Sequence, residues 1–168
     1  MARHAHDSHE PIAAGLAVLT VSDTRTPESD RSGRRIRDLL EGDGHRVLDY
    51  AVLPDEPTVV VERVSEWLAN AECDGVVVSG GTGVSARDRT YEALTRILDK
   101  RLDGFGELFR MLSYEQVGSA AMLSRAVGGV ARGKLLFSLP GSTPAVELGL
   151  TRLVLPELGH LLAELRKH

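Results

Sequence analysis

The sequence predicts one three-layer α/β domain, with a mostly parallel sheet covered by helices on both faces. Two observations predict this fold. From Ile12 onward, strand-like segments alternate with segments whose apolar residues repeat at helical spacing. The strand-like segments are apolar along their whole length, which is typical of parallel strands buried on both faces. The length of 168 residues suits a single domain, because a chain of roughly 150 residues buries about 70% of its unfolded surface.

The first predicted elements are two strands with a helix between them. Gly15–Val21 is a short apolar run and predicts a buried strand. The apolar face of the helix is formed by Ile36, Leu39 and Leu40. Gly42–Gly44 ends this helix, and His45–Leu53 predicts the second strand.

A second helix and a third strand follow. Pro54–Pro57 is typical of a helix start, with Asp55 as the expected N-cap. The apolar face of this helix is formed by Val60, Val64, Trp67 and Leu68. Gly75–Ser79 then predicts a buried strand, because three consecutive valines stand between a glycine and a serine.

The C-terminal half predicts three helical regions and one more strand. Apolar residues return at helical spacing in two places, at Leu94, Ile97 and Leu98 and at Phe105, Leu108, Phe109 and Leu112. Lys134–Leu139 predicts the strand. Residues 145–167 predict the last helical region, which Pro156 is expected to break or kink.

Residues 1–11 predict a flexible tail ahead of a domain at residues 12–168. The tail contains His4, His6 and His9 among polar residues. Histidines so spaced can bind a transition metal weakly, but a solvated tail is the stronger interpretation. Cys73 is the one cysteine of the chain, so an internal disulfide and a multi-cysteine metal site are excluded. We expect it to be partly buried and to have no catalytic role.

Charge and composition argue against nucleic-acid and membrane partners. The formal net charge is −4 and aromatic residues make up 4% of the chain, so neither a basic footprint nor a base-stacking platform is expected. The N-terminus lacks the apolar stretch of a signal peptide. No apolar run approaches the length that crosses a bilayer. We therefore expect a cytoplasmic protein.

Polar and glycine-rich segments follow the predicted strands at the point where each strand ends. These segments are Ser22–Thr24, Pro54–Glu56, Gly80–Gly83 with Arg87–Thr90 behind it, and Pro140–Thr143. In open parallel sheets, ligands bind beyond the carboxyl ends of the strands. The sequence therefore predicts a binding site at this edge of the sheet.

Gly80–Gly83 is the segment best suited to a phosphate group. Glycines let backbone N–H groups approach an anion closely and adopt positive φ, and a following helix N-terminus adds partial positive charge. The loop lacks the Gly-Lys-Ser/Thr end of a P-loop, and it is not the dinucleotide-binding fingerprint. Taken alone, it is better explained as a tight turn without a ligand.

Asp55 and Asp88 are expected to project from neighbouring strand ends. Mg²⁺ is typically bound by one or two carboxylates together with substrate phosphates. The alternative is that both residues cap helices, which is a serious alternative for Asp55. Thr90 can cap the next helix itself, which leaves Asp88 free for other contacts. Beside a glycine loop, the metal interpretation is favoured for the pair.

Other side chains can contact an anionic ligand or a heterocycle. The arginines that suit this role are Arg87, Arg89, Arg110 and Arg125, although solvated surface charge is the preferred interpretation for Arg89 and Arg110. The hydroxyl groups that suit it are those of Ser113, Ser124, Ser138 and Ser142. No histidine stands where a serine–histidine pair requires one, so nucleophilic hydrolase chemistry is disfavoured.

As a set, these motifs resemble the MoaB/MogA family of molybdenum cofactor biosynthesis proteins, and the resemblance runs from about Ala14 to the last helix. The matching segments are Leu19–Asp23, Asp30–Gly33, Leu53–Glu56, Ser79–Gly83, Arg87–Asp88, Thr90, Glu92–Ala93, Gly104–Glu107, Leu123–Ala126 and Leu139–Ser142. Residues 104–113 lean toward the B-type branch. The family often carries proline where this chain has Tyr91, so the helix start after Asp88 is expected to differ slightly.

The resemblance implies ATP- and Mg²⁺-dependent adenylylation of molybdopterin, in a homotrimer or a homohexamer. It implies that Asp55 and Asp88 serve catalysis and hold the metal. The expected nucleotide and pterin contacts are Ser22, Asp23, Gly80, Gly81, Thr82, Gly83, Ser113, Ser138, Pro140, Gly141 and Ser142. The molybdate-insertion enzyme is a further expected partner.

Three alternatives remain open. The main one is a non-catalytic molybdopterin-binding or scaffold protein of the same pathway, because some B-type members lack one or both acidic residues. A pyrophosphatase of the competence-damage type shares the fold but usually carries another domain. Molybdate insertion is less favoured, because those enzymes surround this domain with others.

Overall fold

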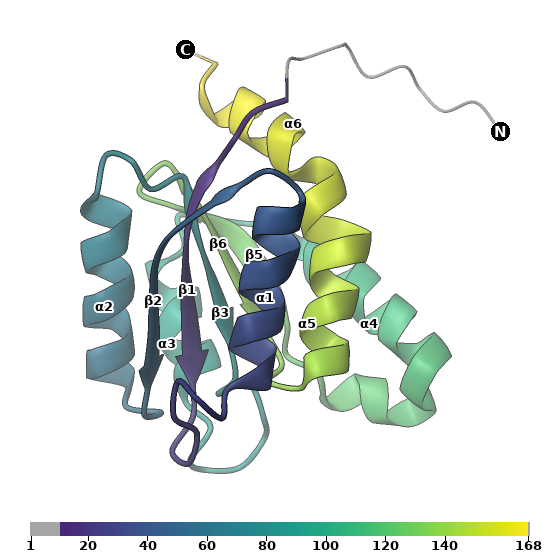
Figure 1. The fold of residues 1–168 in the computed structure, drawn as a ribbon. Helices are drawn as coiled ribbons and strands as arrows, with labels where there is room; N and C mark the ends of the chain where they lie inside the picture. The colour runs from purple at the N-terminus through teal and green to yellow at the C-terminus, as the bar shows by residue number, and fades with distance from the viewer. Residues whose placement is uncertain (1–10, 168) are drawn as a thin grey trace, which may run out of the picture.

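The fold is built on one six-stranded sheet with the order β2-β1-β3-β6-β5-β4. The computed structural model describes residues 11–167 (Figure 1), so residues 1–10 of the predicted tail, which include its three histidines, lie outside the described residues. The strands are β1 (Gly15–Val21), β2 (Arg46–Leu53), β3 (Gly75–Ser79), β4 (Lys100–Arg101), β5 (Val127–Ala131) and β6 (Lys134–Leu139). β2, β1, β3 and β6 are parallel, whereas β5 is antiparallel to β6 and to β4.

Helices cover both faces of the sheet, as the sequence predicted. The helices are α1 (Arg31–Gly42), α2 (Pro57–Ala69), α3 (Thr90–Ile97), α4 (Asp103–Val117), α5 (Thr143–Gly149) and α6 (Leu155–Leu165). Residues of α1, α4, α5 and α6 pack against one face in a core that includes Val18 and Phe137. Residues of α2 and α3 pack against the other face around Leu19 and Leu136. None of the helices in the described part of the chain is long and apolar enough to cross a membrane.

The path of the chain places a topological switch point between β1 and β3. From β1 the chain passes through α1 to β2 on one side, and then returns through α2 to β3 on the other side of β1. Because α1 and α2 lie on opposite faces (Figure 1), the loops that leave β1 and β3 diverge at neighbouring strand ends. Such a switch point is where open α/β sheets bind ligands.

The antiparallel strands β4 and β5 were not predicted. β4 has two residues, both charged and exposed. β5 contains Gly128 and Gly129, which weaken any strand pattern, but the packing requires them. A Cβ at Gly128 would lie 2.7 Å from the ring of Phe137, and one at Gly129 would lie 2.2 Å from the carbonyl oxygen of Lys100.

A two-residue turn joins β5 to β6. Arg132 and Gly133 both have positive φ, 52° and 74°, and the residues on either side of them, Ala131 and Lys134, are paired across the strands. Two left-handed residues match the twist of the flanking strands. The entry to β5 and the exit from β6 therefore lie at the same end of the sheet.

The last helical region contains an irregular turn ahead of Pro156. A π-helical turn, η2 (Leu150–Val154), joins α5 to α6, and the proline stands in the first turn of α6. Proline lacks a backbone donor and is tolerated in the first turn of a helix. The predicted break is therefore a local widening of one continuous helical run (Figure 1).

Candidate functional site

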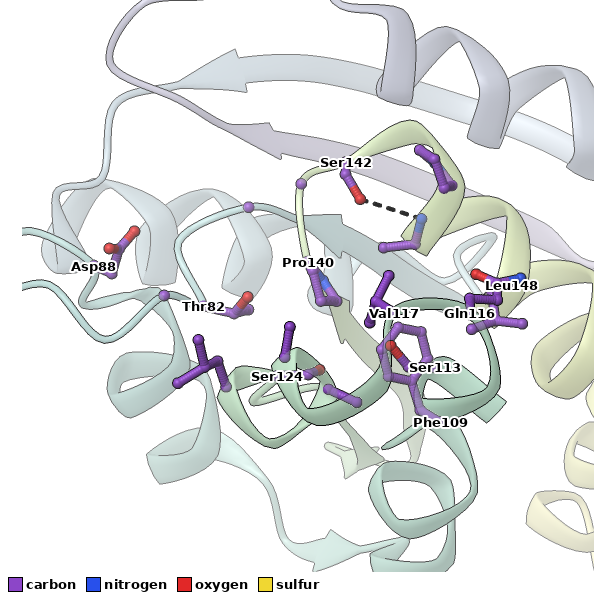
Figure 2. Close-up of a pocket in the computed structure, with 18 of the residues that line it drawn as sticks. Thr82, Asp88, Phe109, Ser113, Gln116, Val117, Ser124, Pro140, Ser142 and Leu148 are labelled. Carbon is purple, nitrogen blue, oxygen red and sulfur yellow. Dashed lines mark hydrogen bonds between the residues drawn. The ribbon is translucent and has the colours of Figure 1, made fainter. Parts of the chain in front are cut away.

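A cleft of about 470 Å³ lies at the carboxyl edge of the parallel strands. Its walls are the loops after β3 and β6 and the face formed by α4, the 3₁₀ helix η1 (Gly118–Leu123) and Ser124 (Figure 2). The predicted residues that line it are Gly80, Gly81, Thr82, Gly83, Asp88, Ser113, Ser124, Pro140, Gly141 and Ser142. Among the described residues of the lining, Asp88 is the one charged side chain.

The glycine loop shows the backbone freedom that its composition predicted. Gly80 and Gly81 have φ of 94° and 68°, which side-chain-bearing residues rarely adopt. A Cβ at Gly80 would lie 2.2 Å from the carbonyl oxygen of Val21, and one at Gly81 would lie 2.2 Å from Oγ1 of Thr90. The amide of Gly80 donates to Leu139, whereas those of residues 81–83 have no acceptor among the described residues. These amides are available to a bound anion.

Asp88 presents its carboxylate to the cleft (Figure 2). The residue is half-buried and its Oδ2 accepts a hydrogen bond from Ser85. A Cβ at Gly83 would lie 2.6 Å from the same oxygen, so the carboxylate rests against the bare backbone of the glycine loop. The side chain has further acceptor capacity for a metal or a donor on a ligand.

Asp55 lies behind the glycine loop and does not line the cleft. It is 4% exposed, and its carboxylate accepts hydrogen bonds from the amide of Arg89 and from Oγ1 of Thr90. The predicted N-cap role of Asp55 for α2 is therefore wrong, because the N-cap is Glu56, without a side-chain hydrogen bond. Thr90 is not a cap either: Arg89 precedes it at the N-cap position of α3, and the Thr90 hydroxyl donates to Asp55.

The two carboxylates lie near one another at the glycine loop. A Cβ at Gly81 would lie 2.8 Å from Oδ2 of Asp55, two residues from the contact between Gly83 and Asp88. Burial raises the pKa of Asp55, the bonds from Thr90 and Arg89 lower it, and the negative charges of Asp88 and Asp23 raise it further. The net shift is upward, chiefly because burial disfavours the charged form, and a bound cation would stabilise the ionised carboxylate.

The carboxylates of Asp55 and Asp88 suit a metal ion that takes its remaining ligands from a substrate. The described residues contain no group of three or more His, Cys, Asp or Glu side chains that could enclose a metal ion. A pair of carboxylates with room for phosphate oxygens is the pattern typical of Mg²⁺. The residues present therefore fit this cation.

Asp23 and Ser22 hold loops together and do not line the cleft. Asp23 accepts the amide of Asp55 and forms an ion pair with Arg87, at 2.7 Å, and Arg87 also contacts Glu56 at 2.8 Å. The Arg87 side chain and the Asp55 amide lower the pKa of Asp23 to about 2. Oγ of Ser22 accepts the amides of residues 24 and 25 in a local turn. The sequence placed both residues at the correct sheet edge, but their contacts lie within the protein.

The predicted hydroxyl groups fall into two sets. Ser113, Ser124 and Ser142 line the cleft (Figure 2), and the Ser142 hydroxyl also accepts the amide of Ala145 and caps α5. Ser138 is 1% exposed, does not line the cleft, and its hydroxyl has no hydrogen-bond partner. Its place in β6 explains its burial, because the side chain points to the face opposite to that of Phe137 and Leu139, the face that α2 and α3 cover.

Arg125 contacts backbone carbonyl groups of the glycine loop and does not line the cleft. Its guanidinium donates to the carbonyl oxygens of Thr82, Gly83 and Asp88 and forms an ion pair with Glu92. Arg110 makes one long contact with the carbonyl oxygen of residue 126, at 3.5 Å. The described lining therefore has no cationic side chain from this chain.

Sequence reasoning missed the apolar wall of the cleft. This wall comprises Phe109, Val117, Ala120, Ala121, Leu123, Pro144, Ala145 and Leu148. The helical pattern around Phe109 marked a core face but gave no sign that its end borders a cleft. An apolar wall opposite a polar glycine loop is the environment expected for a ligand with a flat heterocycle and phosphates.

A second loop of the cleft is fixed by a buried carboxylate that the family motif contains. Asp30 is fully buried and caps α1 through the amide of Gly33, while Tyr50 donates to its other oxygen. Burial acts to raise the pKa of Asp30, but the hydrogen bonds outweigh it and lower the pKa. Arg25 lies 3.7 Å from Asp30 and donates to the carbonyl oxygen of Gly141 at 3.0 Å.

Comparisons with known proteins identify the family of the chain. A family model described as a probable molybdopterin binding domain matches residues 17–160. A curated relative, molybdenum cofactor biosynthesis protein B from Halalkalibacterium halodurans, is 47% identical over 163 residues, which is 96% of each chain. The chain belongs to the MoaB/MogA family.

Solved structures of this family have the same fold. A crystal structure of a molybdenum cofactor biosynthesis protein B matches with a TM-score of 0.92 at 45% identity, over 95% of this chain and 100% of the other. The tungsten cofactor synthesizing protein MoaB from Pyrococcus furiosus matches with a TM-score of 0.84 at 37% identity, over 94% and 99%. This MoaB/MogA member therefore has the full family fold, and the expected fold class is confirmed.

Proposed function

We propose that this protein takes part in molybdenum cofactor biosynthesis and that it adenylylates molybdopterin. In this reaction an oxygen of the pterin's terminal phosphate attacks the α-phosphorus of ATP. A new phosphorus–oxygen bond forms, the bond between the α-phosphorus and the bridging oxygen breaks, and pyrophosphate leaves with the bond's electron pair. The attacking phosphate is largely ionised near neutral pH, so the step needs no strong base.

The observation that carries the proposal is the charge of the cleft. Both substrates are polyanions, yet the one charged side chain among the described lining residues is Asp88. A cleft for anions without a cationic side chain requires backbone donors and a divalent cation. The open amides of residues 81–83 and the Asp88 carboxylate supply these two needs at one place.

Each part of the site then has a distinct task. The amides of the glycine loop bind and orient phosphate oxygens, and the apolar wall around Phe109 covers the heterocycles and excludes water. Asp88, with Asp55 behind it, would hold Mg²⁺ by carboxylate oxygens. Mg²⁺, when bound, neutralises phosphate charge during the transfer.

The experiment that tests the proposal measures product formation. Purified protein is supplied with molybdopterin, ATP and Mg²⁺, and the release of pyrophosphate is followed. Asp88→Ala is expected to abolish release and to leave the fold intact, because the half-buried side chain makes a local hydrogen bond with Ser85 and is not part of the apolar core. An active Asp88→Ala variant would contradict the metal role. A wild-type protein that binds pterin without turnover would support the non-catalytic scaffold instead.

We further propose that the protein assembles as a homotrimer or a homohexamer. Large apolar side chains are exposed on α4 and η1, namely Leu108, Met111, Tyr114, Val117, Met122 and Leu123. A patch of this kind marks a protein–protein contact. Light scattering should give the mass of three or six copies, and a monomer at micromolar concentration would contradict the assembly. The molybdate-insertion enzyme, as acceptor of the adenylylated product, remains a proposed partner.

A further inference from the structure

The loop from Thr82 to Asp88 is exposed along its middle. Residues 83–87 are exposed and Asp88 is half-buried, and the side chain of Val84 is 70% exposed. Near the end of the loop, the Arg87 side chain forms ion pairs with Asp23 and Glu56. Yet the loop ends on Asp88, the residue whose carboxylate faces the cleft. Something must fix the two ends of this loop if the carboxylate is to keep one position.

Arg125 contacts both ends of the loop. Its Nε donates to the carbonyl oxygen of Thr82 at 2.8 Å, and its Nη2 donates to the carbonyl oxygens of Gly83 and Asp88, the latter at 3.3 Å. One planar guanidinium thus joins residues that are five and six positions apart. A planar group with five donors suits such a contact, whereas a lysine has a single point of attachment.

The guanidinium is itself held in place. Nη1 forms an ion pair with Glu92 in α3, and the ring of Tyr91 lies under the guanidinium, 4.7 Å from its carbon to the ring centroid. The Arg125 side chain is 24% exposed. Arg125 stands just before β5, and β5 runs antiparallel to β6. The residue therefore reaches the site from the start of a strand, whereas the other residues of the site lie in loops that follow the ends of strands.

The carbonyl contacts also set the direction of the loop amides. All described peptide bonds are trans, so the C=O of one residue and the N–H of the next point opposite ways. The carbonyl groups of Thr82 and Gly83 point to Arg125, so the amides of Gly83 and Val84 point away from it. Gly83 lines the cleft, whereas Arg125 and Val84 do not.

We propose that Arg125 is a positioning residue, which orients the Thr82–Asp88 loop from outside the cleft so that its amides and the Asp88 carboxylate face the substrates. The proposal rests on the proposed function for its catalytic consequence. Its structural part concerns the protein alone and is tested without any ligand.

The first measurement is amide hydrogen exchange in the metal-free protein, followed by mass spectrometry. Arg125→Met removes the donors and keeps the length of the side chain. Within peptides that cover residues 82–90, the amides of Asp88 and Arg89, which donate to Ser85 and Asp55, are expected to exchange about tenfold faster, because the loop that places them loses its hydrogen bonds from a charged donor. Peptides from α6 should keep their wild-type rates. Arg110→Met is the matched control, since Arg110 contacts a carbonyl group next to Arg125 but not the loop, and it should leave residues 82–90 unchanged.

The second measurement separates positioning from a general loss of structure. In the pyrophosphate assay, Arg125→Met is expected to lower kcat about tenfold or more and to raise the Mg²⁺ concentration for half-maximal rate, with KM for molybdopterin within about twofold. Arg125→Lys, which can reach one carbonyl oxygen at a time, should give exchange rates and kinetic constants between those of the wild type and those of Arg125→Met. If Arg125→Met does not fold, Arg125→Lys takes its place in both measurements.

Unchanged exchange at residues 82–90 in both variants would overturn the proposal, as would equal acceleration in every peptide of the domain. A wild-type protein without adenylylation activity would overturn the proposed function, while the exchange rates would still decide the role of Arg125.

Discussion

Gly83→Ala tests whether the position of the Asp88 carboxylate governs activity. The new Cβ would lie 2.6 Å from Oδ2 of Asp88, whereas ordinary contact begins at 3.4 Å, so the carboxylate must retreat by about 0.8 Å. Gly83 does not have positive φ, and the half-buried Asp88 side chain borders the cleft, into which it can turn. We therefore expect the free energy of unfolding to change by less than about 1 kcal/mol. Misplacement by about 1 Å can lower kcat roughly a hundredfold.

The assay is pyrophosphate release at saturating ATP and molybdopterin over a series of Mg²⁺ concentrations, with urea unfolding of the same preparation. Gly159→Ala in α6 is the matched control, because its Cβ meets no atom within 4 Å, and it should turn over at the wild-type rate. A Gly83→Ala enzyme with wild-type kcat and an unchanged Mg²⁺ requirement would refute the reasoning, since the carboxylate would then tolerate displacement.

Three further predictions concern stability. Asp30→Asn should lower the free energy of unfolding by about 1–3 kcal/mol at pH 7. Because the folded-state pKa of Asp30 is lowered, its contribution to stability is present above the ordinary carboxyl pKa near 4 and is lost as pH falls through the lower folded value. The free energy of unfolding should therefore depend less on pH between 7 and 2 in the variant than in the wild type. The same pH dependence in both proteins would contradict this. Ser138→Ala should stabilise the protein by about 1 kcal/mol by removing an unpaired hydroxyl and keep full activity, and destabilisation in urea would show that the hydroxyl has a partner. Gly159→Ala should stabilise α6 by about 0.5–1 kcal/mol, and a lower urea midpoint would count against the open space at that position.

The sequence predicted those strands and helices whose hydropathy pattern matches the way in which they pack in the fold. The valines of β3 are apolar because both faces of the strand are covered, and their pattern alone marks a buried strand. β5 could not be found in this way. Gly128 and Gly129 stand there because neighbouring atoms leave no room for a side chain, a requirement that exists only once Phe137 and Lys100 are in place.

The same distinction holds for the candidate site. Glycines and prolines after strands located the loops at residues 80–83 and 140–142, because these residue types determine the backbone directly. The direction in which a side chain points could not be predicted from the sequence as well as the positions of these loops. Ser138 lies inside the sheet two residues before the cleft-lining Pro140, and Asp55 turns to α3, a helix that begins 35 residues later. Such choices depend on what packs beside the residue, and sequence position gives no direct sign of it.

The tight turn at Arg132 and Gly133 sets the alignment of two cleft walls at the other end of the sheet. It fixes which residue of β5 stands beside which residue of β6, and therefore how far Arg125 reaches relative to Gly141. One inserted residue that slid β5 along its neighbour would move the guanidinium by about 3.4 Å and reverse the faces to which β5 side chains point. A change in loop length on the side of the molecule remote from the ligands would thus disturb the loop that carries Asp88, without altering any residue that lines the cleft.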